Sequence, residues 1–454
     1  MVEAKIGFEL HVYIDMNETK KKLFCNCPVS DAEPNENTCP VCTGQPGNKP
    51  MLPNREAVDK TIKAGLMLNC QINRGLLFQR KHYSWPDLPN GYQKTMSGSY
   101  SVPVGENGNF MGIGIREIHL EEDPARWDPV TGKVDYNRCG YPLIEIVTEP
   151  DFKSSGEVGK WVKKLLLTLS YIKAVDKSAG IKSDVNVSIG PDFKRVEIKN
   201  VNSLKSIAKA IDYEIARQQE EPVDKMQTRA WDDEKAQTVF MRAKETLQQY
   251  MFIPEPDLPV VLIDDAYIEK IREQLPERPE EKVEKYVKLG VSREDAAILG
   301  SERLLAEMFE KIAKEIDPTL AAKWLRRELL RVMNYNEKQF SDLKMDARHM
   351  IELLKMVETK QITDATARKI LEKLVEGPFS PKEYVEKEGM GVISGEEELK
   401  KLCREAVSEN PSAIEDYKKG EEKALNFVVG KVMQKTRGKA DPAVVNKLLK
   451  EIIK

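Results

Sequence analysis

Residues 109–120 read NFMGIGIREIHL, and apolar side chains recur at every second position along much of this run. The same alternation appears in FELHVYI at 8–14, LIEIVTEP at 143–150, SDVNVSIG at 183–190 and RVEIKNVNS at 195–203. Because successive side chains of a strand point to opposite faces of its sheet, this period of two predicts strands with one buried face. Segments rich in Gly, Pro and Asn separate the runs, so we expect an antiparallel sheet.

Helical patterns interrupt these strands. The sequence predicts helices over residues 54–68, 155–172 and 203–219. Ser154 or Ser155 would cap the second helix, because a serine hydroxyl can accept from the first free backbone N–H groups. The Pro-rich segment IPEPDLP at 253–259 would lead out of this part of the chain. Helices packed on an antiparallel sheet predict an α+β fold.

The second half of the chain has no strand pattern after about residue 290. Amphipathic helices are predicted at 292–315, 319–333, 342–359, 363–376, 381–388, 396–408, 411–435, with a break near 418–420, and 441–453. Pro and Gly residues punctuate them. A chain of 454 residues is too long for one ordinary core, so we expect two or three domains, and the change of pattern along the chain favours three. Their predicted bounds are 1–290 for the sheet domain, 291–400 for a helical domain and 401–454 for a small helical tail domain.

The composition is that of a globular chain without membrane helices. The formal net charge is only −3, from 71 Lys and Arg against 74 Asp and Glu. Nucleic-acid contacts would therefore depend on local basic patches. No apolar run reaches the roughly 18 residues of a membrane helix, and no secretory signal pattern is present. With seven cysteines in a chain of this size, a disulfide framework would be unusual, so we expect a reducing, cytoplasmic compartment.

Four of the seven cysteines fall within 18 residues. Cys25 and Cys27 form a C-x-C pair, and Cys39 and Cys42 form a C-x-x-C pair on turn-forming sequence. Such pairs can converge on one tetrahedral Zn²⁺. Four thiolates leave no open coordination position, so the zinc would be structural. The alternative is four unrelated buried thiols.

Carboxylates and histidines are embedded between apolar residues in three predicted strands. These motifs are Glu9-Leu10-His11, His119-Leu120-Glu121-Glu122-Asp123 and Leu143-Ile144-Glu145-Ile146. Residues two apart share a strand face, so Glu9 lies with His11, and His119 with Glu121, while Glu122 takes the other face unless the strand bends. A buried carboxylate needs a cation, and carboxylates suit Mg²⁺ held against phosphate groups. Ordinary ion pairs or solvated faces are the alternative.

A cationic and hydroxyl-rich segment could contact phosphate groups. It comprises residues 80–83 (RKHY) and 86–93 (PDLPNGYQ). Residues 183–186 (SDVN) and 197–200 (EIKN) add polar side chains with a period of two, although solvated strand faces would look the same. The sequence has neither a Walker A motif nor G-x-G-x-x-G, so a standard phosphate loop gives no argument for ATP.

These segments together resemble the B subunit of the aspartyl/glutamyl-tRNA amidotransferase. The resemblance spans nearly the whole chain in the family's order. It rests on IGFELHV, KLFCNC, PNENTCPVCTGQPG, FQRKHYSWPDLPNGYQ, IHLEED, VDYNRCGYPLIEIVTEPD, DVNVSIG, EIKNVNS, IPEPDLP and EKALNFVVGKVMQKTRGKADPAVVNKLL. A sister subunit of the archaeal glutamate-specific enzyme shares such motifs, but it also carries a large insertion for which this chain has no room.

The resemblance implies a cradle domain akin to the glutamine synthetase fold, followed by the helical and tail domains. It also implies that ATP phosphorylates the side-chain carboxylate of Glu on tRNA(Gln) or of Asp on tRNA(Asn). Ammonia from the amidase (glutaminase) partner, in a complex that also contains a small third subunit, would then displace phosphate. An acyl phosphate has a good leaving group, whereas a carboxylate does not, and Mg²⁺ would neutralise charge on the transferring phosphoryl group.

The resemblance further implies roles for particular residues. His11, Glu122 and Glu145 would hold Mg²⁺, with Glu9 in support. The ATP site would be lined by Lys81, Tyr83, Asp184, Asn186, Glu197 and Lys199. Lys182 stands where many members have Arg, and Gln249-Tyr250-Met251-Phe252-Ile253 replaces their Asp-Tyr-Arg-Tyr-Phe. The missing arginine leaves one phosphate or substrate contact open.

A non-catalytic tRNA-binding or scaffolding protein is the competing interpretation. Its support is cationic: Arg326 and Arg327 lie with Lys323 and Arg331 on one predicted helix of the helical domain. The tail adds Lys431, Lys435, Arg437 and Lys439 around a predicted helix end. Such cations suit the phosphate backbone of tRNA, while a solvated helix end is the alternative. The sequence leaves the choice between tRNA(Gln) and tRNA(Asn) open.

Overall fold

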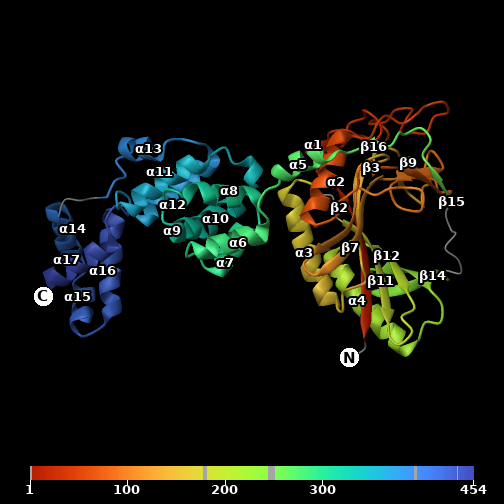
Figure 1. Ribbon diagram of the computed structural model, residues 1–454. Coiled ribbons are helices and arrows are strands. Elements are labelled where there is room, and N and C mark those ends of the chain that lie inside the picture. Colours follow the sequence, from red (N-terminus) through yellow and green to blue (C-terminus); the bar gives the residue numbers. More distant parts are fainter. Residues whose placement is uncertain (1–2, 177–180, 244–250, 393–395, 437, 454) are drawn as a thin grey trace. The chain divides into compact units, whose positions relative to one another are not determined.

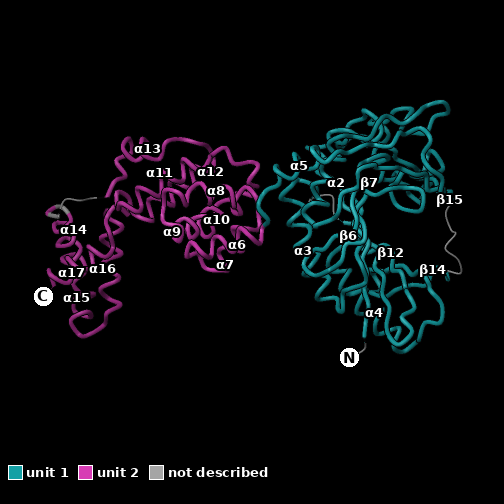
Figure 2. Tube along the Cα trace, viewed as in Figure 1, with its two compact units in different colours: residues 1–278 teal, residues 279–454 magenta. Residues whose placement is uncertain are grey.

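The computed structural model describes residues 3–176, 181–243, 251–392, 396–436 and 438–453. The chain forms two compact units, Met1–Arg278 and Pro279–Lys454 (Figure 2). Among the described residues, no helix is long and apolar enough to cross a membrane. Unit 1 combines a large sheet with helices and unit 2 is helical, which confirms the predicted α+β class.

The centre of unit 1 is a 12-stranded sheet (Figure 1). Its main path runs β14-β13-β12-β11-β1-β10-β7-β5-β4-β15, and β6 and β2 branch from β7. The strands are β1 (Ala4–Tyr13), β2 (Gln71–Ile72), β4 (Gln79–His82), β5 (Tyr92–Thr95), β6 (Gly105–Phe110), β7 (Ile113–Glu122), β10 (Pro142–Thr148), β11 (Ile181–Ile189), β12 (Val196–Val201), β13 (Gln227–Asp232), β14 (Gln237–Ala243) and β15 (Met251–Pro254). Two small sheets pair β3 (Gly75–Leu76) with β16 (Val261–Leu262), and β8 (Arg126–Trp127) with β9 (Val134–Asp135).

Two details of the sheet differ from the predicted strand pattern. The pair β12 and β13 is parallel, because helix α4 (Leu204–Glu220) supplies the crossover between them. The run 109–120 is a hairpin rather than one strand. Met111 and Gly112 both have positive φ, 53° and 83°, and turn β6 into β7.

One face of the sheet carries the core of unit 1. Even-numbered residues of β1, among them Phe8, Leu10 and Val12, are buried with apolar residues of β7, β10, β11 and β12. The helices α2 (Arg55–Met67), α3 (Ser155–Tyr171) and α4 supply the other half of this core (Figure 1). Asn54, Ser154 and Ser203 cap them by accepting backbone N–H groups. The apolar period of two thus leaves the opposite strand face to polar residues.

Two further helices, α1 (Met16–Thr19) and α5 (Asp265–Glu273), complete unit 1. The helices of unit 2 are α6 (Pro279–Lys288), α7 (Arg293–Leu299), α8 (Arg303–Ile312), α9 (Pro318–Lys323), α10 (Leu330–Tyr335), α11 (Ala347–Glu358), α12 (Asp364–Glu376), α13 (Pro381–Lys387), α14 (Glu396–Glu409), α15 (Pro411–Lys418), α16 (Glu422–Lys435) and α17 (Pro442–Ile453). A π-helical segment, Trp324–Leu329, joins α9 to α10, and Phe340–Asp342 is a short 3-10 helix.

Buried side chains of unit 2 form two hydrophobic clusters, one within residues 286–385 and one within 399–453. The predicted boundary between a helical and a tail domain near residue 400 stays a prediction. The division between the two compact units falls between residues 278 and 279, at the start of α6.

Candidate active site

The polar face of the sheet gathers the charged residues of the three strand motifs. In the strand register, His11 of β1 lies opposite Glu145 of β10, and Glu145 lies opposite His119 of β7. All three side chains therefore share one face. Their odd-numbered positions follow directly from the burial of the even-numbered apolar residues on the other face.

The first cluster on this face contains His11, Glu121 and Glu145. His11 Nδ1 lies 3.1 Å from Glu121 Oε1 and 4.0 Å from Glu145 Oε2. One ligand atom from each residue lies within 4.8 Å of the others, which is the spacing of a possible metal site. His119 Nε2 lies 2.6 Å from Glu145 Oε2, and Thr95 Oγ1 donates to Glu121 Oε2 at 3.2 Å. Two buried carboxylates are thus held in place by neighbouring side chains.

The electrostatics of this cluster favour charged groups. Burial acts to lower the pKa of His11, but Glu145 and Glu121 outweigh it and raise that pKa to about 9. Burial acts to raise the pKa of Glu145, but His119 and His11 overcome it and lower that pKa. The positive charge of Lys81 acts in the same direction on Glu145. The negative charge of Glu145 is thus favoured within the cluster.

A second cluster lies on the neighbouring strands. Glu9 of β1, Asp184 of β11 and Glu197 of β12 also bring carboxylate oxygens within 4.8 Å of one another. Lys199 Nζ lies 2.5 Å from Asp184 Oδ2 and 3.5 Å from Glu197 Oε1. Burial and the charge of Glu145 raise the pKa of Glu9, so the two clusters are close enough to influence each other. Asn186 Nδ2 donates to Glu9 Oε1 at 3.2 Å.

The structure does not bring Glu122 to His11 and Glu145. Glu122 is on the other strand face, where its Oε1 accepts from Lys94 Nζ at 2.8 Å and from Lys94 N at 2.9 Å. Glu121 stands in its place beside His11. The alternation within residues 119–122 already indicated this arrangement, whereas the family resemblance favoured Glu122.

The residues predicted to line an ATP site fall into two groups. Asp184, Asn186, Glu197 and Lys199 lie together on β11 and β12. Lys81 and Tyr83 belong to β4 and the segment after it, on the other side of the first cluster in the strand order. Arg80, next to Lys81, is engaged by Glu255 at 2.8 Å and Asp257 at 3.1 Å, so it is an internal contact of unit 1.

The four clustered cysteines converge. One Sγ atom from each of Cys25, Cys27, Cys39 and Cys42 lies within 4.8 Å of the others. A hydrogen bond with Cys25 lowers the pKa of the Cys42 thiol, and Lys22 Nζ, 3.3 Å from Cys42 Sγ, adds to the effect. Lys22 also donates to Tyr136 O at 3.1 Å. This buried lysine therefore ties the cysteine cluster to the segment that leads into β10.

The cations predicted to contact tRNA differ in their ion pairing and in their exposure. Arg326 is held by Glu294 and Asp295, and Lys435 by Glu405 and Glu409. Arg327 is exposed on the π-helical segment, and Lys431 and Lys439 are partly exposed. Lys431 Nζ lies 5.3 Å from the ring centroid of Phe427. Arg437 lies outside the described residues.

Comparison with known proteins covers the whole chain. Residues 4–269 match the family model described as the GatB/GatE catalytic domain, and residues 307–453 match the one described as the GatB domain. The chain belongs to the GatB family.

Several members of this family are similar to this chain along nearly their full length. The chain is 44% identical over 471 residues to a protein of Methanococcus maripaludis, with 100% of this chain and 99% of the relative covered. It is also 44% identical to proteins of Methanopyrus kandleri, covering 99% of each chain, and of Methanocaldococcus jannaschii, covering 99% and 98%. Each relative is named as the B subunit of an aspartyl/glutamyl-tRNA(Asn/Gln) amidotransferase. The family resemblance seen in the sequence is thereby confirmed.

Proposed function

We propose that this GatB-family chain uses ATP to phosphorylate the side-chain carboxylate of Glu on tRNA(Gln), of Asp on tRNA(Asn), or of both. Ammonia then displaces phosphate to give the amide. The observation that carries this proposal is the pair of carboxylate clusters on one polar sheet face, His11–Glu121–Glu145 and Glu9–Asp184–Glu197. Full-length relatives named as amidotransferase B subunits supply the reaction class.

The donor atoms of both clusters fit Mg²⁺. Carboxylate oxygens are the ligands that Mg²⁺ prefers, and His11, whose pKa is raised to about 9 in the chain alone, would have to release its proton to add a nitrogen ligand. His11, Glu121 and Glu145 would hold one ion, while Glu9, Asp184 and Glu197 could hold a second. Asn186 Oδ1 is buried and has no hydrogen-bond partner within the described part of the chain, so a bound group would satisfy it. Bound Mg²⁺ would neutralise charge on the phosphates of ATP and on the phosphoryl group in transfer.

The chain's own residues would orient the reactants. Lys199, between two carboxylates, would contact phosphate oxygens on the β11–β12 side. Lys81, whose charge reaches Glu145, would act from the β4 side. Attacking and leaving oxygens of a phosphoryl transfer lie roughly in line, so ATP on one side of the first cluster requires the carboxylate acceptor on the other. We take the residues of β11 and β12 as the nucleotide side of the site. The residues of β4 and the segment after it then lie on the acceptor side.

Partner subunits would supply the ammonia. The relatives are named as B subunits, which implies further subunits, and for this chain we propose an amidase (glutaminase) partner and a small third subunit. The acyl phosphate would lose phosphate to ammonia, with the C–N bond formed as the C–O bond to phosphate breaks. The polar face, with its buried acidic groups, would hold the intermediate away from bulk water.

We also propose one structural Zn²⁺ at Cys25, Cys27, Cys39 and Cys42. Four Sγ atoms that lie within 4.8 Å of one another fit a closed tetrahedral site. Contact of the tRNA body with three cations of unit 2, the exposed Arg327 and the partly exposed Lys431 and Lys439, would add affinity without reading sequence. Ion-paired Arg326 and Lys435 would contribute to the fold of unit 2 rather than to this contact.

An amidation assay tests the proposed reaction. The chain is combined with its amidase and small subunits, and amide formation is measured on Glu-tRNA(Gln) and on Asp-tRNA(Asn), each with and without ATP·Mg²⁺. ATP-dependent product on at least one substrate is expected. A complex that binds both tRNAs but forms no amide on either would instead favour a non-catalytic scaffold.

A further inference from the structure

Two segments of the chain leave the central sheet at the same end of their strands. Strands β4 and β7 each pair antiparallel with β5, which lies between them, so β4 and β7 run in the same direction. β4 ends at His82 and β7 ends at Glu122. The segments that follow carry Trp85 and Trp127, three and five residues beyond these strand ends.

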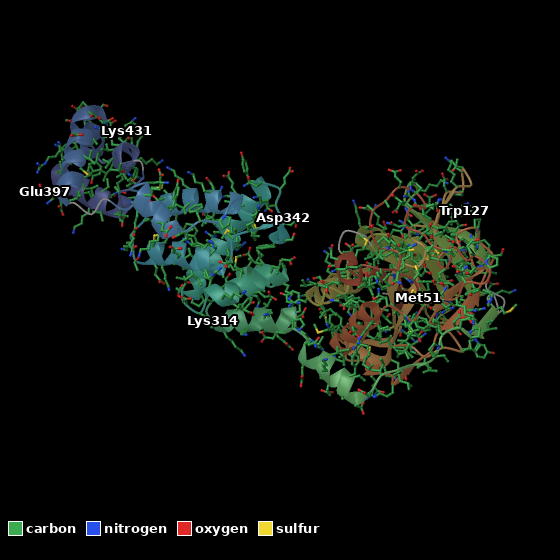
Figure 3. All side chains as sticks on the ribbon, turned by 90° about the horizontal axis from the view of Figure 1, so that it is seen from above. Met51, Trp127, Lys314, Asp342, Glu397 and Lys431 are labelled. Atoms are coloured by element: carbon green, nitrogen blue, oxygen red, sulfur yellow. The ribbon has the colours of Figure 1, made fainter. Side chains whose placement is uncertain are left out.

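These two tryptophans contact each other at the surface of unit 1. Their ring centroids lie 5.6 Å apart with an angle of 48° between the planes. Trp85 is 57% exposed and Trp127 is partly exposed; Figure 3 shows Trp127 at the periphery of unit 1. Ala125 N donates to Asp87 O at 2.9 Å, which fastens the two loops together. An exposed, preassembled pair of indoles has large apolar faces available to a flat ligand.

The pair lies near the first carboxylate cluster. Trp127 follows Glu121 by six residues, and Trp85 follows Lys81 by four, so the chain limits their separations to about 20 Å and about 14 Å at most. At this same edge, Tyr13 Oη donates to Asp123 Oδ2 at 2.6 Å. His11 and Glu121 are two residues before these edge residues on their strands. The pair therefore lies on the β4–β7 side of the cluster, which the proposed function takes as the acceptor side because Lys199 would contact the phosphates of ATP on the β11–β12 side.

The hairpin that contains Trp127 carries exposed cations alongside Asp128 and Asp135. Arg126 and Lys133, both on the β8–β9 hairpin or its turn, are exposed. Aromatic side chains that stack bases, combined with cations that contact phosphates, are the usual means of binding an unpaired strand of RNA. The adenine of ATP is a less suitable occupant, because Lys199 and the second cluster lie on the opposite side of His11 and Glu145.

We propose that Trp85 and Trp127 form a stacking platform for an unpaired base at the 3′ end of the RNA that carries the amino acid. This inference rests on the proposed function, since it places the aminoacylated end of the RNA at the acceptor side of the site. Stacking there would orient the esterified amino acid so that its side-chain carboxylate points toward His11, Glu121 and Glu145. Arg126 and Lys133 would contact the adjoining phosphates.

A binding cycle between protein and RNA tests the platform. The reconstituted complex is titrated with a tRNA transcript that ends in its unpaired 3′ adenosine and with the same transcript lacking that nucleotide. Removing the adenosine or substituting Trp85→Leu is expected to weaken binding by roughly 5- to 100-fold each, as for loss of one stacked base. The combination should be no weaker than either change alone. Trp85→Phe should retain most of the affinity, and Phe240→Leu, which changes a residue that is 54% exposed on β14, is the matched control.

Several outcomes would overturn the platform. Additive losses of affinity when Trp85→Leu is combined with the shortened transcript would do so. Equal binding of the two transcripts to the wild-type protein, or an effect of Trp85→Leu on the KM for ATP alone, would do so as well. Amidation by the wild-type complex is measured in parallel. If it is absent on every charged tRNA, the proposed function fails, whereas the binding cycle still decides whether the platform contacts the RNA end.

Discussion

His11 Nδ1 lies 3.1 Å from Glu121 Oε1 on one face of the sheet, whereas Glu122 lies on the other face. Glu122 instead pairs with Lys94, whose side chain is only 5% exposed. Two adjacent glutamates therefore have different tasks. Glu121 belongs to the proposed Mg²⁺ site, and Glu122 neutralises a buried ammonium group.

This separation predicts opposite effects for two matched substitutions. Glu121→Gln should lower the rate of amide formation by about 100-fold or more, because a charged ligand of the metal is lost. Glu122→Gln should leave the Mg²⁺ dependence of the rate nearly unchanged but lower the free energy of unfolding by about 3 kcal/mol, since Lys94 would be left unpaired. Rate measurements over a range of Mg²⁺ concentration, with urea unfolding of both variants, distinguish the two. If Glu122→Gln alone lost the Mg²⁺ dependence of the rate, Glu122 would be the metal ligand, as the family resemblance favoured.

The cysteine cluster should bind one Zn²⁺ per chain. Cys39→Ser should remove the metal and lower the free energy of unfolding by about 3 kcal/mol or more, because a structural zinc contributes directly to folding. Cys70→Ala changes a buried cysteine outside the cluster and should keep the zinc. Metal analysis of native protein and of both variants gives the answer. Native protein free of zinc would refute the assignment.

An ion pair between α1 and α2 predicts a pH dependence of stability. Burial acts to raise the pKa of Glu18, but hydrogen bonds from Lys60 and Lys173 overcome it and lower that pKa to about 2. A lowered pKa stabilises the fold above the ordinary value of 4.5, and this contribution is lost as the pH falls toward 2. Glu18→Gln should therefore cost about 1 kcal/mol at neutral pH and progressively less below pH 4.5.

The control for this pair is Glu56→Gln. Glu56 lies 3.6 Å from Lys60 and is more exposed, so its removal should have a smaller effect at every pH. Unfolding free energies are compared by urea titration at several pH values. A Glu18→Gln cost that did not shrink in acid would show that the ion pair is not its cause.

Neighbouring arginines of the π-helical segment should affect tRNA binding differently. Arg327→Ala removes an exposed cation, so it should weaken tRNA binding and flatten the slope of log affinity against log salt by about 0.7 to 0.9. Arg326→Ala should instead destabilise unit 2, because Glu294 and Asp295 lose their partner, and should leave the salt slope unchanged. Equal salt slopes for Arg327→Ala and the wild type would exclude a phosphate contact at Arg327.

The sequence predicted most elements because their patterns are local. The period of two marked β1, β10, β11 and β12, and a serine cap marked the start of α3. The parallel pairing of β12 with β13 depends on the crossover through α4, which a strand pattern does not encode. The turn at Met111 and Gly112 lies within an apolar run and so carried no polar signal.

The parts of the site that depend on local patterns were also predictable from the sequence. Strand periodicity placed Glu9 with His11 and His119 with Glu121, and the cysteine spacing indicated one convergent cluster. Which glutamates meet across β1, β10 and β7 depends on strand order and register, which only the folded chain supplies. The same holds for Arg326, whose partners come from α7, and for Trp85 and Trp127, which are 42 residues apart in the chain.

The central claim is that the side-chain carboxylate of the charged tRNA is phosphorylated on the polar face of the sheet. The most direct test uses Glu-tRNA(Gln) or Asp-tRNA(Asn) whose side-chain carboxylate carries a heavy isotope at both oxygens. The reconstituted complex converts it to the amide with ATP and ammonia, and the released inorganic phosphate is examined by mass spectrometry. The account predicts one labelled oxygen in each phosphate formed with amide, and a loss of this transfer in Glu145→Gln that parallels the loss of amide. Amide formation that leaves the phosphate unlabelled would contradict it.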